Sequence, residues 1–88
     1  MSDVQPGIYR HFTGAVYDVI GVSSDSLDLS KVVVYKCTDG TLRHRPYDTF
    51  VKTRGGEPIF VRMNDQRVGR GLFHAAQRRR LKHLAKKL

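Results

Sequence analysis

The ten residues KVVVYKCTDG, at positions 31–40, carry the clearest structural signal in the sequence. Three valines and a tyrosine follow one another at residues 32–35, and such residues favour strands. Because the run is apolar on both faces, we expect it at the centre of a sheet. Thr38-Asp39-Gly40 then supplies the residues of a tight hairpin turn. The chain is therefore expected to return as a strand over residues 41–45.

Short strand signals recur on both sides of this hairpin. Before it, the sequence predicts strands over residues 7–12 and 15–22, and Ile20 and Val22 share one face of the second. After it, we expect one helical turn over residues 47–50 and a last strand over 58–63. No crossover helix separates the strands, so the sequence predicts a mainly β fold, a small antiparallel barrel or rolled sheet. Cys37, beside the apolar run, is expected to be a small buried residue of its core.

The charge of the chain is divided unevenly. The 88 residues include 16 Lys or Arg and 8 Asp or Glu, which gives a net charge of +8. Residues 1–66 contain eight charges of each sign, whereas residues 67–88 contain eight cations and no acid. We therefore divide the chain into a small β domain over residues 1–66 and a basic segment over residues 67–88. This division points to a polyanion as the partner.

The basic segment has the period of an amphipathic α-helix. Its apolar residues fall on one narrow stripe, and Gly69 and Gly71 predict a hinge before the helix. Because so short a helix is marginal alone, the stripe must dock on something. The β domain, a second copy in a homodimer, a membrane surface and a partner protein all remain open. The stripe consists of Phe73, Leu81, Leu84 and Leu88.

The cations of this segment, with two arginines of the predicted fourth strand, form a candidate nucleic-acid surface. Eight cations in 22 residues can neutralise several phosphates, in binding that depends steeply on salt. No helix with base-reading side chains can be assigned, so we expect no sequence specificity and leave DNA and RNA open. The predicted contacts are Arg70, Arg78, Arg79, Arg80, Lys82, Lys86, Lys87, Arg43 and Arg45.

A second candidate surface is aromatic. Side chains from several strands predict a shallow aromatic and basic site that stacks a base and holds a phosphate. The alternative function is a module that binds a small molecule or peptide there, with the basic segment mediating assembly. Packing in the core is an alternative role for these side chains under either function, because tyrosines fill the cores of small barrels. Three other interpretations of the basic segment remain: a helix that only improves solubility, a helix that lies on a membrane surface, and a helix that binds an acidic protein. The candidate ligand-binding residues are Tyr9, His11, Tyr17, Tyr35 and Arg45.

No pattern in the sequence predicts a metal, a cofactor or a catalytic residue. The four histidines and the single cysteine lack the spacing of metal ligands. There is no glycine-rich phosphate loop, and the serines of residues 23–30 have no positioned base. No apolar run approaches the length of about 20 residues that a membrane span needs. With no signal segment at residues 1–7 either, we expect a cytoplasmic protein that is not an enzyme.

The motifs of the β domain resemble those of a bacterial and phage family known as domain of unknown function 1653. That family has a Gly, a Tyr, a His-aromatic-Lys-Gly and a Tyr-x-Val, then Val-Val-Tyr, Arg-Pro with an aromatic after it, and Pro-x-Phe. The resemblance covers about residues 7–62 and implies a compact SH3-like barrel, but it does not supply a biochemical activity. The matching residues are Gly7, Tyr9, His11, Phe12, Gly14, Tyr17, Val19, Val33, Val34, Tyr35, Arg45, Pro46, Phe50, Pro58, Ile59 and Phe60.

The chain departs from the family pattern at three places. Thr13 stands where the family has a lysine before the first turn glycine. The loop over residues 23–28 lacks the family's histidine, and Arg43-His44 stands where an aromatic is common. A family ligand that depends on those residues would be lost or altered here, and the basic segment lies outside the resemblance.

Overall fold

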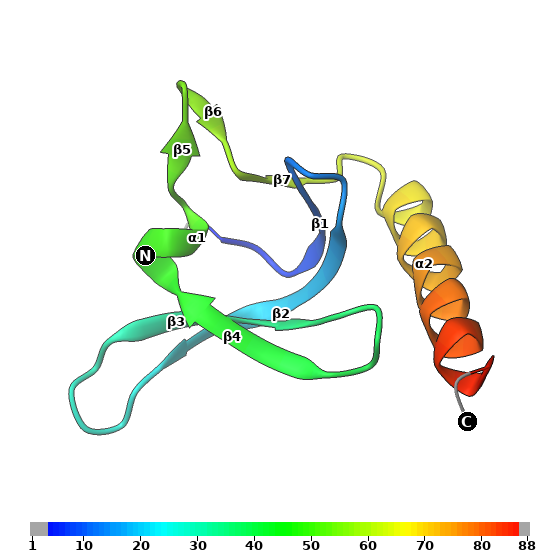
Figure 1. The fold of residues 1–88 in the computed structure, drawn as a ribbon. Coiled ribbons are helices and arrows are strands. Elements are labelled where there is room, and N and C mark those ends of the chain that lie inside the picture. The colour runs from blue at the N-terminus through cyan, green and yellow to red at the C-terminus, as the bar shows by residue number, and fades with distance from the viewer. Residues whose placement is uncertain (1–3, 87–88) are drawn as a thin grey trace.

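The computed structural model describes the backbone of residues 4–86 and the side chains of residues 4–82. In this part of the chain, seven strands and two helices follow one another (Figure 1). The elements are β1 (Gly7–His11), β2 (Val16–Ser24), β3 (Lys31–Lys36), β4 (Leu42–Pro46), α1 (Tyr47–Phe50), β5 (Thr53–Arg54), β6 (Glu57–Pro58), β7 (Phe60–Arg62) and α2 (Gln66–Lys86).

Five strands form one curled antiparallel sheet, in the order β4-β3-β2-β1-β7. The predicted central hairpin is present, with Tyr35 of β3 opposite Arg43 of β4 and Val33 opposite Arg45. Within the described residues, the outer strands β4 and β7 are not paired with each other, so the predicted barrel is an open, rolled sheet. The mainly β class and the C-terminal helix are confirmed. Strands β5 and β6 pair as a separate small hairpin.

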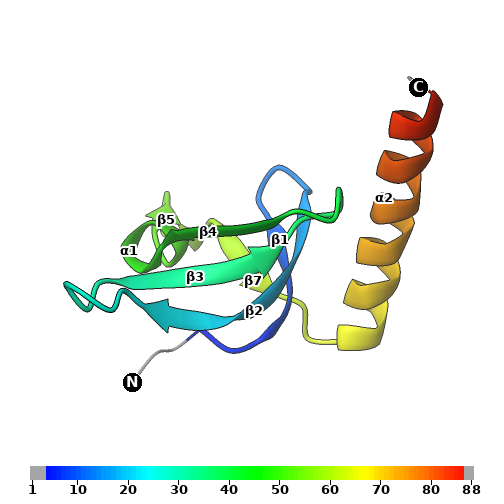
Figure 2. The ribbon, with the colours of Figure 1, turned by 90° about the horizontal axis from the view of Figure 1, so that it is seen from below.

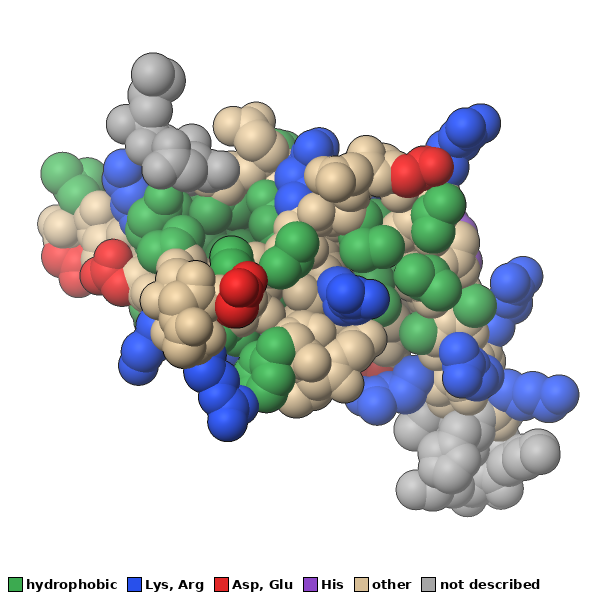
Figure 3. Space-filling model, turned by 90° about the horizontal axis from the view of Figure 1, so that it is seen from above, with side chains coloured by type: hydrophobic (Ala, Val, Ile, Leu, Met, Phe, Trp, Pro, Cys, Tyr) green, Lys and Arg blue, Asp and Glu red, His purple; other side chains and the backbone are tan. Residues whose placement is uncertain are grey.

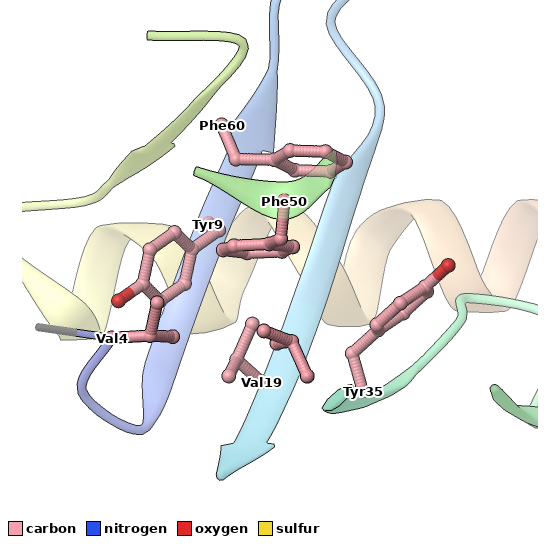
Figure 4. Packing of buried hydrophobic residues seen from close by; sticks show 7 residues of the cluster. Val4, Tyr9, Val19, Tyr35, Phe50 and Phe60 are labelled. Carbon is pink, nitrogen blue, oxygen red and sulfur yellow. The ribbon is translucent and has the colours of Figure 1, made fainter. Parts of the chain in front are cut away.

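The inner face of the rolled sheet holds the hydrophobic core. The Phe50 and Phe60 rings stack with their centroids 4.3 Å apart, and the Tyr9 ring meets Phe50 edge-on at 5.4 Å (Figure 4). Helix α1 is the predicted single turn, and it delivers Phe50 to this cluster. The cluster consists of Val4, Tyr9, Val19, Val33, Tyr35, Phe50 and Phe60.

Strand β2 contains an irregularity that the alternating pattern does not predict. Its register against β3 shifts between Val19 and Gly21, as in a β-bulge. Val22 consequently packs against the same core as Val19, whereas Ile20 is exposed. The expectation that Ile20 and Val22 share a face was therefore wrong.

Helix α2 lies against the outer face of β1 and β2 (Figure 2). Ile8 is fully buried and Phe73 is 3% exposed at this contact, so part of the predicted stripe docks on the β domain of the same chain. Leu81 remains 49% exposed, and the side chains of Leu84 and Leu88 lie outside the described residues. Neither α1 nor α2, as far as the structure describes them, is long and apolar enough to cross a membrane.

The two glycines that predicted a hinge lie inside α2, because the helix begins at Gln66. A Cβ atom on Gly69 would lie 2.9 Å from the Ile8 Cβ and 3.1 Å from the Met63 Cβ, whereas a Cβ on Gly71 would meet nothing within 4 Å. Gly69 therefore allows the helix to approach the sheet closely. The hinge prediction was wrong because a tertiary contact, and not chain flexibility, explains this glycine.

Polar contacts fix the first turn of α2. The Asp65 carboxylate accepts hydrogen bonds from the backbone amides of Arg67 and Val68, at 3.0 and 3.4 Å, and so caps the helix. The Gln66 side-chain oxygen accepts from the Ile8 amide of β1 at 2.6 Å, and its nitrogen donates to the Met63 carbonyl. The start of α2 is thus tied directly to β1, which fixes the position of the helix beside the sheet.

Candidate functional site

A groove separates the middle of α2 from the turns at one end of the sheet. Its volume is about 640 Å³, and its walls come from the β1–β2 turn, the β3–β4 hairpin and α2. Figure 2 shows how the hairpin tip approaches the helix. The lining residues are Gly14, Ala15, Val16, Tyr17, Tyr35, Cys37, Thr38, Asp39, Arg43, Arg45, Ala76, Arg79 and Arg80.

Four arginines line the groove from two different elements. Arg43 and Arg45 are two residues apart on β4, so they share one face of the strand. Arg79 and Arg80 stand three and four residues after Ala76, so the three share one face of α2. Figure 3 shows Lys and Arg side chains gathered around the α2 end of the molecule. The folding of the chain thus brings two separate pairs of guanidinium groups to one groove.

Asp39 is the one carboxylate among the described residues that line the groove. It accepts hydrogen bonds from the Thr41 hydroxyl at 2.6 Å and from the Thr41 amide at 2.9 Å. These bonds lower the pKa of Asp39, and the charges of Arg80 and Arg43 lower it further. The aspartate is therefore ionised at neutral pH, where it shapes the hairpin turn and offsets part of the positive charge of the groove.

Aromatic rings continue from the groove into the core. The Tyr17 and Tyr35 rings meet edge-on with centroids 5.1 Å apart, and Tyr17 lies 5.8 Å from Phe60. Burial raises the pKa of Tyr17, as do Cys37 and Tyr35, while Arg45 and Arg80 act in the opposite direction. The Arg45 guanidinium lies 5.1 Å from the centre of the Phe60 ring, a cation–π contact that helps to orient it. The groove therefore has a rigid aromatic side next to its arginines.

The remaining aromatic candidates lie outside the lining of this groove. Tyr9 is 6% exposed in the core, where its hydroxyl donates to the Gln5 carbonyl at 2.8 Å. Figure 4 shows the Tyr9 and Tyr35 hydroxyls pointing to opposite sides of the cluster. His11 lies in a smaller hollow beside the groove, 4.8 Å from the Phe60 ring between centroids. The structure therefore brings Tyr17, Tyr35 and Arg45 together, with His11 close by and Tyr9 apart.

The surroundings of His11 favour its neutral imidazole form. Its Nδ1 accepts a hydrogen bond from the Thr13 amide at 3.3 Å and lies 2.7 Å from the Thr13 hydroxyl. An imidazole that accepts at Nδ1 carries its proton on Nε2. Burial lowers the pKa of His11, and the charge of Arg45 lowers it further. Among the described residues, no three His, Cys, Asp or Glu side chains gather as metal ligands would.

The other predicted phosphate contacts occupy different positions on α2. Arg70 lies 3.9 Å from the Asp18 carboxylate of β2, which partly neutralises it. Arg78 and Lys82 are exposed and do not line the groove. The side chains of Lys86 and Lys87 lie outside the described residues. Arg79 and Arg80 are therefore the predicted contacts of α2 that face the sheet across the groove.

Sequence reasoning missed the residues that position α2. Asp65, Gln66 and Gly69 carry no ligand-binding signal, yet they set where the helix wall of the groove stands. A helix start at Asp65 could have been recognised, because aspartate is a favoured N-cap. Their partner on β1 is Ile8, which lies 58 residues before Gln66 and still further from Gly69, and no local pattern shows this contact.

Comparison with known proteins covers the β domain. The family model for Protein of unknown function (DUF1653) matches residues 7–65 and so ends one residue before α2 begins. A crystal structure of a DUF1653 protein from Bordetella bronchiseptica is similar to this chain, with a TM-score of 0.61 and 27% identity over 72% of this chain and 91% of that one. No curated protein matches. Because the family model matches more than half of the sequence, the chain belongs to the DUF1653 family.

Proposed function

We propose that the protein binds nucleic acid through the groove between α2 and the sheet, without reading its sequence. The observation that carries the proposal is the convergence of Arg43 and Arg45 from β4 with Arg79 and Arg80 from α2. Guanidinium groups bind phosphate oxygens through paired hydrogen bonds. Two pairs on facing walls fit a backbone that passes between them.

The net charge of +8 supports the same partner, because it attracts a polyanion from a distance. We further propose that the protein acts by binding and not by catalysis. Asp39, the carboxylate of the described lining, is engaged by Thr41 and lies beside arginines, an arrangement that keeps it ionised. Such a carboxylate is a poor general acid, and His11 lies outside the groove lining.

Paired arginine variants test this proposal with a matched control. Four phosphate contacts predict that the logarithm of the association constant falls against the logarithm of salt concentration with a slope of about −3. Arg79→Ala and Arg80→Ala should each weaken binding and flatten that slope by about 1. Arg78→Ala removes the same charge from an exposed position outside the groove, and it should leave the slope nearly unchanged. Fluorescence anisotropy with a labelled oligonucleotide at several salt concentrations measures both quantities.

The reverse change at Asp39 completes the test. Asp39→Asn removes a negative charge that lies close to Arg80 and Arg43, so binding should strengthen by up to about fivefold. Equal losses in the Arg78, Arg79 and Arg80 variants would show that the groove is not the binding site. Absence of salt-dependent binding by the intact protein would refute the nucleic-acid function itself.

The groove's volume favours one alternative, a module that binds a small molecule or peptide. Pockets for such ligands usually enclose about 300–1,000 Å³ and are lined by aromatic side chains with a few polar groups. The groove of about 640 Å³ beside Tyr17 and Tyr35 satisfies that description. In the same experiment, a free nucleotide can be added as a competitor. Competition that is seen with the unaltered protein and is lost in the Arg79→Ala and Arg80→Ala variants would favour a mononucleotide ligand over a polymer.

A further inference from the structure

We propose that the groove selects a single, unpaired strand and excludes the double helix. The inference rests on the proposed function and names the substrate class of that same site. It starts from where the cations stand. Arg79 and Arg80 are exposed, share the α2 face of Ala76 and line the groove together with residues of the β3–β4 hairpin.

A helix that binds duplex DNA enters a groove about 12 Å wide and must present its contact residues on a free, convex face. Helix α2 is not free in that way. Its inner face is buried on the sheet through Gly69 and Phe73. Its arginines Arg79 and Arg80 line the same groove as the arginines of β4. In this proposal a duplex contacts exposed cations of α2 such as Arg78 and Lys82, which do not line the groove, and does not enter the groove itself.

The size of the groove leads to the same conclusion. A volume of about 640 Å³ suits a ligand of small-molecule dimensions, which corresponds to a short stretch of one unpaired strand. A base pair with a backbone on each side is larger than a ligand of those dimensions. A single strand can instead pass through with its phosphates between the two arginine pairs.

The aromatic side of the groove supplies the contact that an unpaired base needs. Tyr17 is partly exposed, and its position is fixed by edge-on packing against Tyr35 and by its neighbour Phe60. Single-strand binding sites combine a basic groove with aromatic rings on which bases stack. Bases inside a duplex are already stacked and cannot reach such a ring. The juxtaposition of Tyr17 with four arginines therefore favours unpaired nucleotides.

The sequence provides a natural reporter for occupancy of the groove. Cys37 is the single cysteine of the chain, it lines the groove and it is partly exposed. Its alkylation by N-ethylmaleimide, followed by mass spectrometry, reports on this one position. A strand that lies in the groove should protect Cys37, whereas nucleic acid that binds only the outer face of α2 should leave it reactive.

The experiment compares labelled dT12 with a blunt 12-base-pair duplex, using the full chain at one fixed salt concentration. We expect dT12 to bind at least tenfold more tightly and to protect Cys37. Tyr17→Leu should weaken dT12 binding by about fivefold or more and leave duplex binding unchanged. Phe12→Leu, at an exposed ring outside the groove, is the matched control and should change neither. Circular dichroism checks that both variants are folded.

The outcomes separate this inference from the function on which it rests. If the duplex binds as tightly as dT12, or protects Cys37 equally well, single-strand selection is wrong while nucleic-acid binding stands. If dT12 binds tightly but Cys37 reacts at the same rate as in the free protein, the strand does not occupy the groove. Both this inference and the assignment of binding to the groove then fail, while nucleic-acid binding itself stands. If neither probe binds in a salt-dependent manner, the proposed function fails first. The Cys37 measurement uses the unaltered protein, so it remains decisive even if Tyr17→Leu does not fold.

Discussion

At the scale of single residues, the environment of His11 connects the fold to pH. Its Nδ1 accepts hydrogen bonds only while the imidazole is neutral, and burial and Arg45 both oppose protonation. The folded pKa is therefore lower than the unfolded one. As pH falls through the ordinary range of histidine, the unfolded chain takes up a proton that the folded protein resists, so the free energy of unfolding decreases.

We predict that His11→Asn reduces the loss of stability between pH 7.5 and pH 5.5. Asparagine keeps a polar side chain at the position but has no imidazole to protonate. Urea denaturation at the two pH values measures the change. His44→Asn, at an exposed position of β4, controls for the removal of a histidine. If the loss of stability in His11→Asn equals that of the unaltered protein, His11 is not responsible for it.

The sequence predicted those site residues whose position follows from the alternation of side chains along a strand. Tyr17, Tyr35 and Arg45 were expected at one aromatic and basic surface, and the structure brings them to the same groove. Tyr9 has the same residue type and strand position, but its hydroxyl is engaged by the backbone of Gln5. That partner belongs to the segment before β1, for which the sequence predicts no structure. Tyr35 lines the groove and yet is only 5% exposed in the core cluster, whereas Tyr17 is partly exposed. Residue type alone thus does not distinguish a buried tyrosine from one that is accessible in the groove.

At the scale of elements, the hairpins were more predictable than the helix. Turn residues and apolar runs mark β3, β4 and α1 locally, and those elements lie within a residue or two of their expected bounds. The start of α2 was placed too late, because two glycines have low helix propensity. The approach to Ile8 overrides that propensity at Gly69. The bulge in β2 likewise depends on pairing with β3 and leaves no local signal.

The two glycines of α2 give a paired prediction with opposite signs. Gly71→Ala should raise the free energy of unfolding by about 0.5–1 kcal/mol, because alanine is the better helix former and the position is open. Gly69→Ala gains the same propensity but places a methyl group against Ile8 and Met63, which costs about 1–3 kcal/mol. Chemical denaturation of both variants tests this. Stabilisation by both substitutions would show that α2 does not approach the sheet as closely as described.

At the scale of the whole molecule, α2 both completes the groove and covers the sheet. Ile8 is fully buried although it lies outside the main core cluster, and Phe73 of α2 is buried as well. The helix is thus part of the folded unit, although its charge differs from that of the β domain. The charge division in the sequence marks a difference in surface properties, and it does not mark a boundary between independent structures.

Phe73→Ala should therefore destabilise the entire protein. Removal of a buried phenylalanine costs about 3–5 kcal/mol, a large fraction of the stability of so small a domain. Leu81→Ala, on the same helix but half exposed, should cost less than about 1 kcal/mol. Urea unfolding monitored by tyrosine fluorescence reports the β domain separately from helix content. A Phe73→Ala variant that loses helix content while its tyrosine transition stays unchanged would contradict this coupling.

The open sheet has a consequence for self-association. Because β4 pairs with β3 and not with β7, it is an edge strand, and such strands tend to recruit strands from other molecules. Its sequence, LRHRP, carries two arginines and ends in proline, the residue types that discourage such pairing. Arg43 and Arg45 thus protect the edge while they line the groove. Under the proposed function, a substitution at either arginine changes both the protection of this edge and the binding of phosphate in the groove.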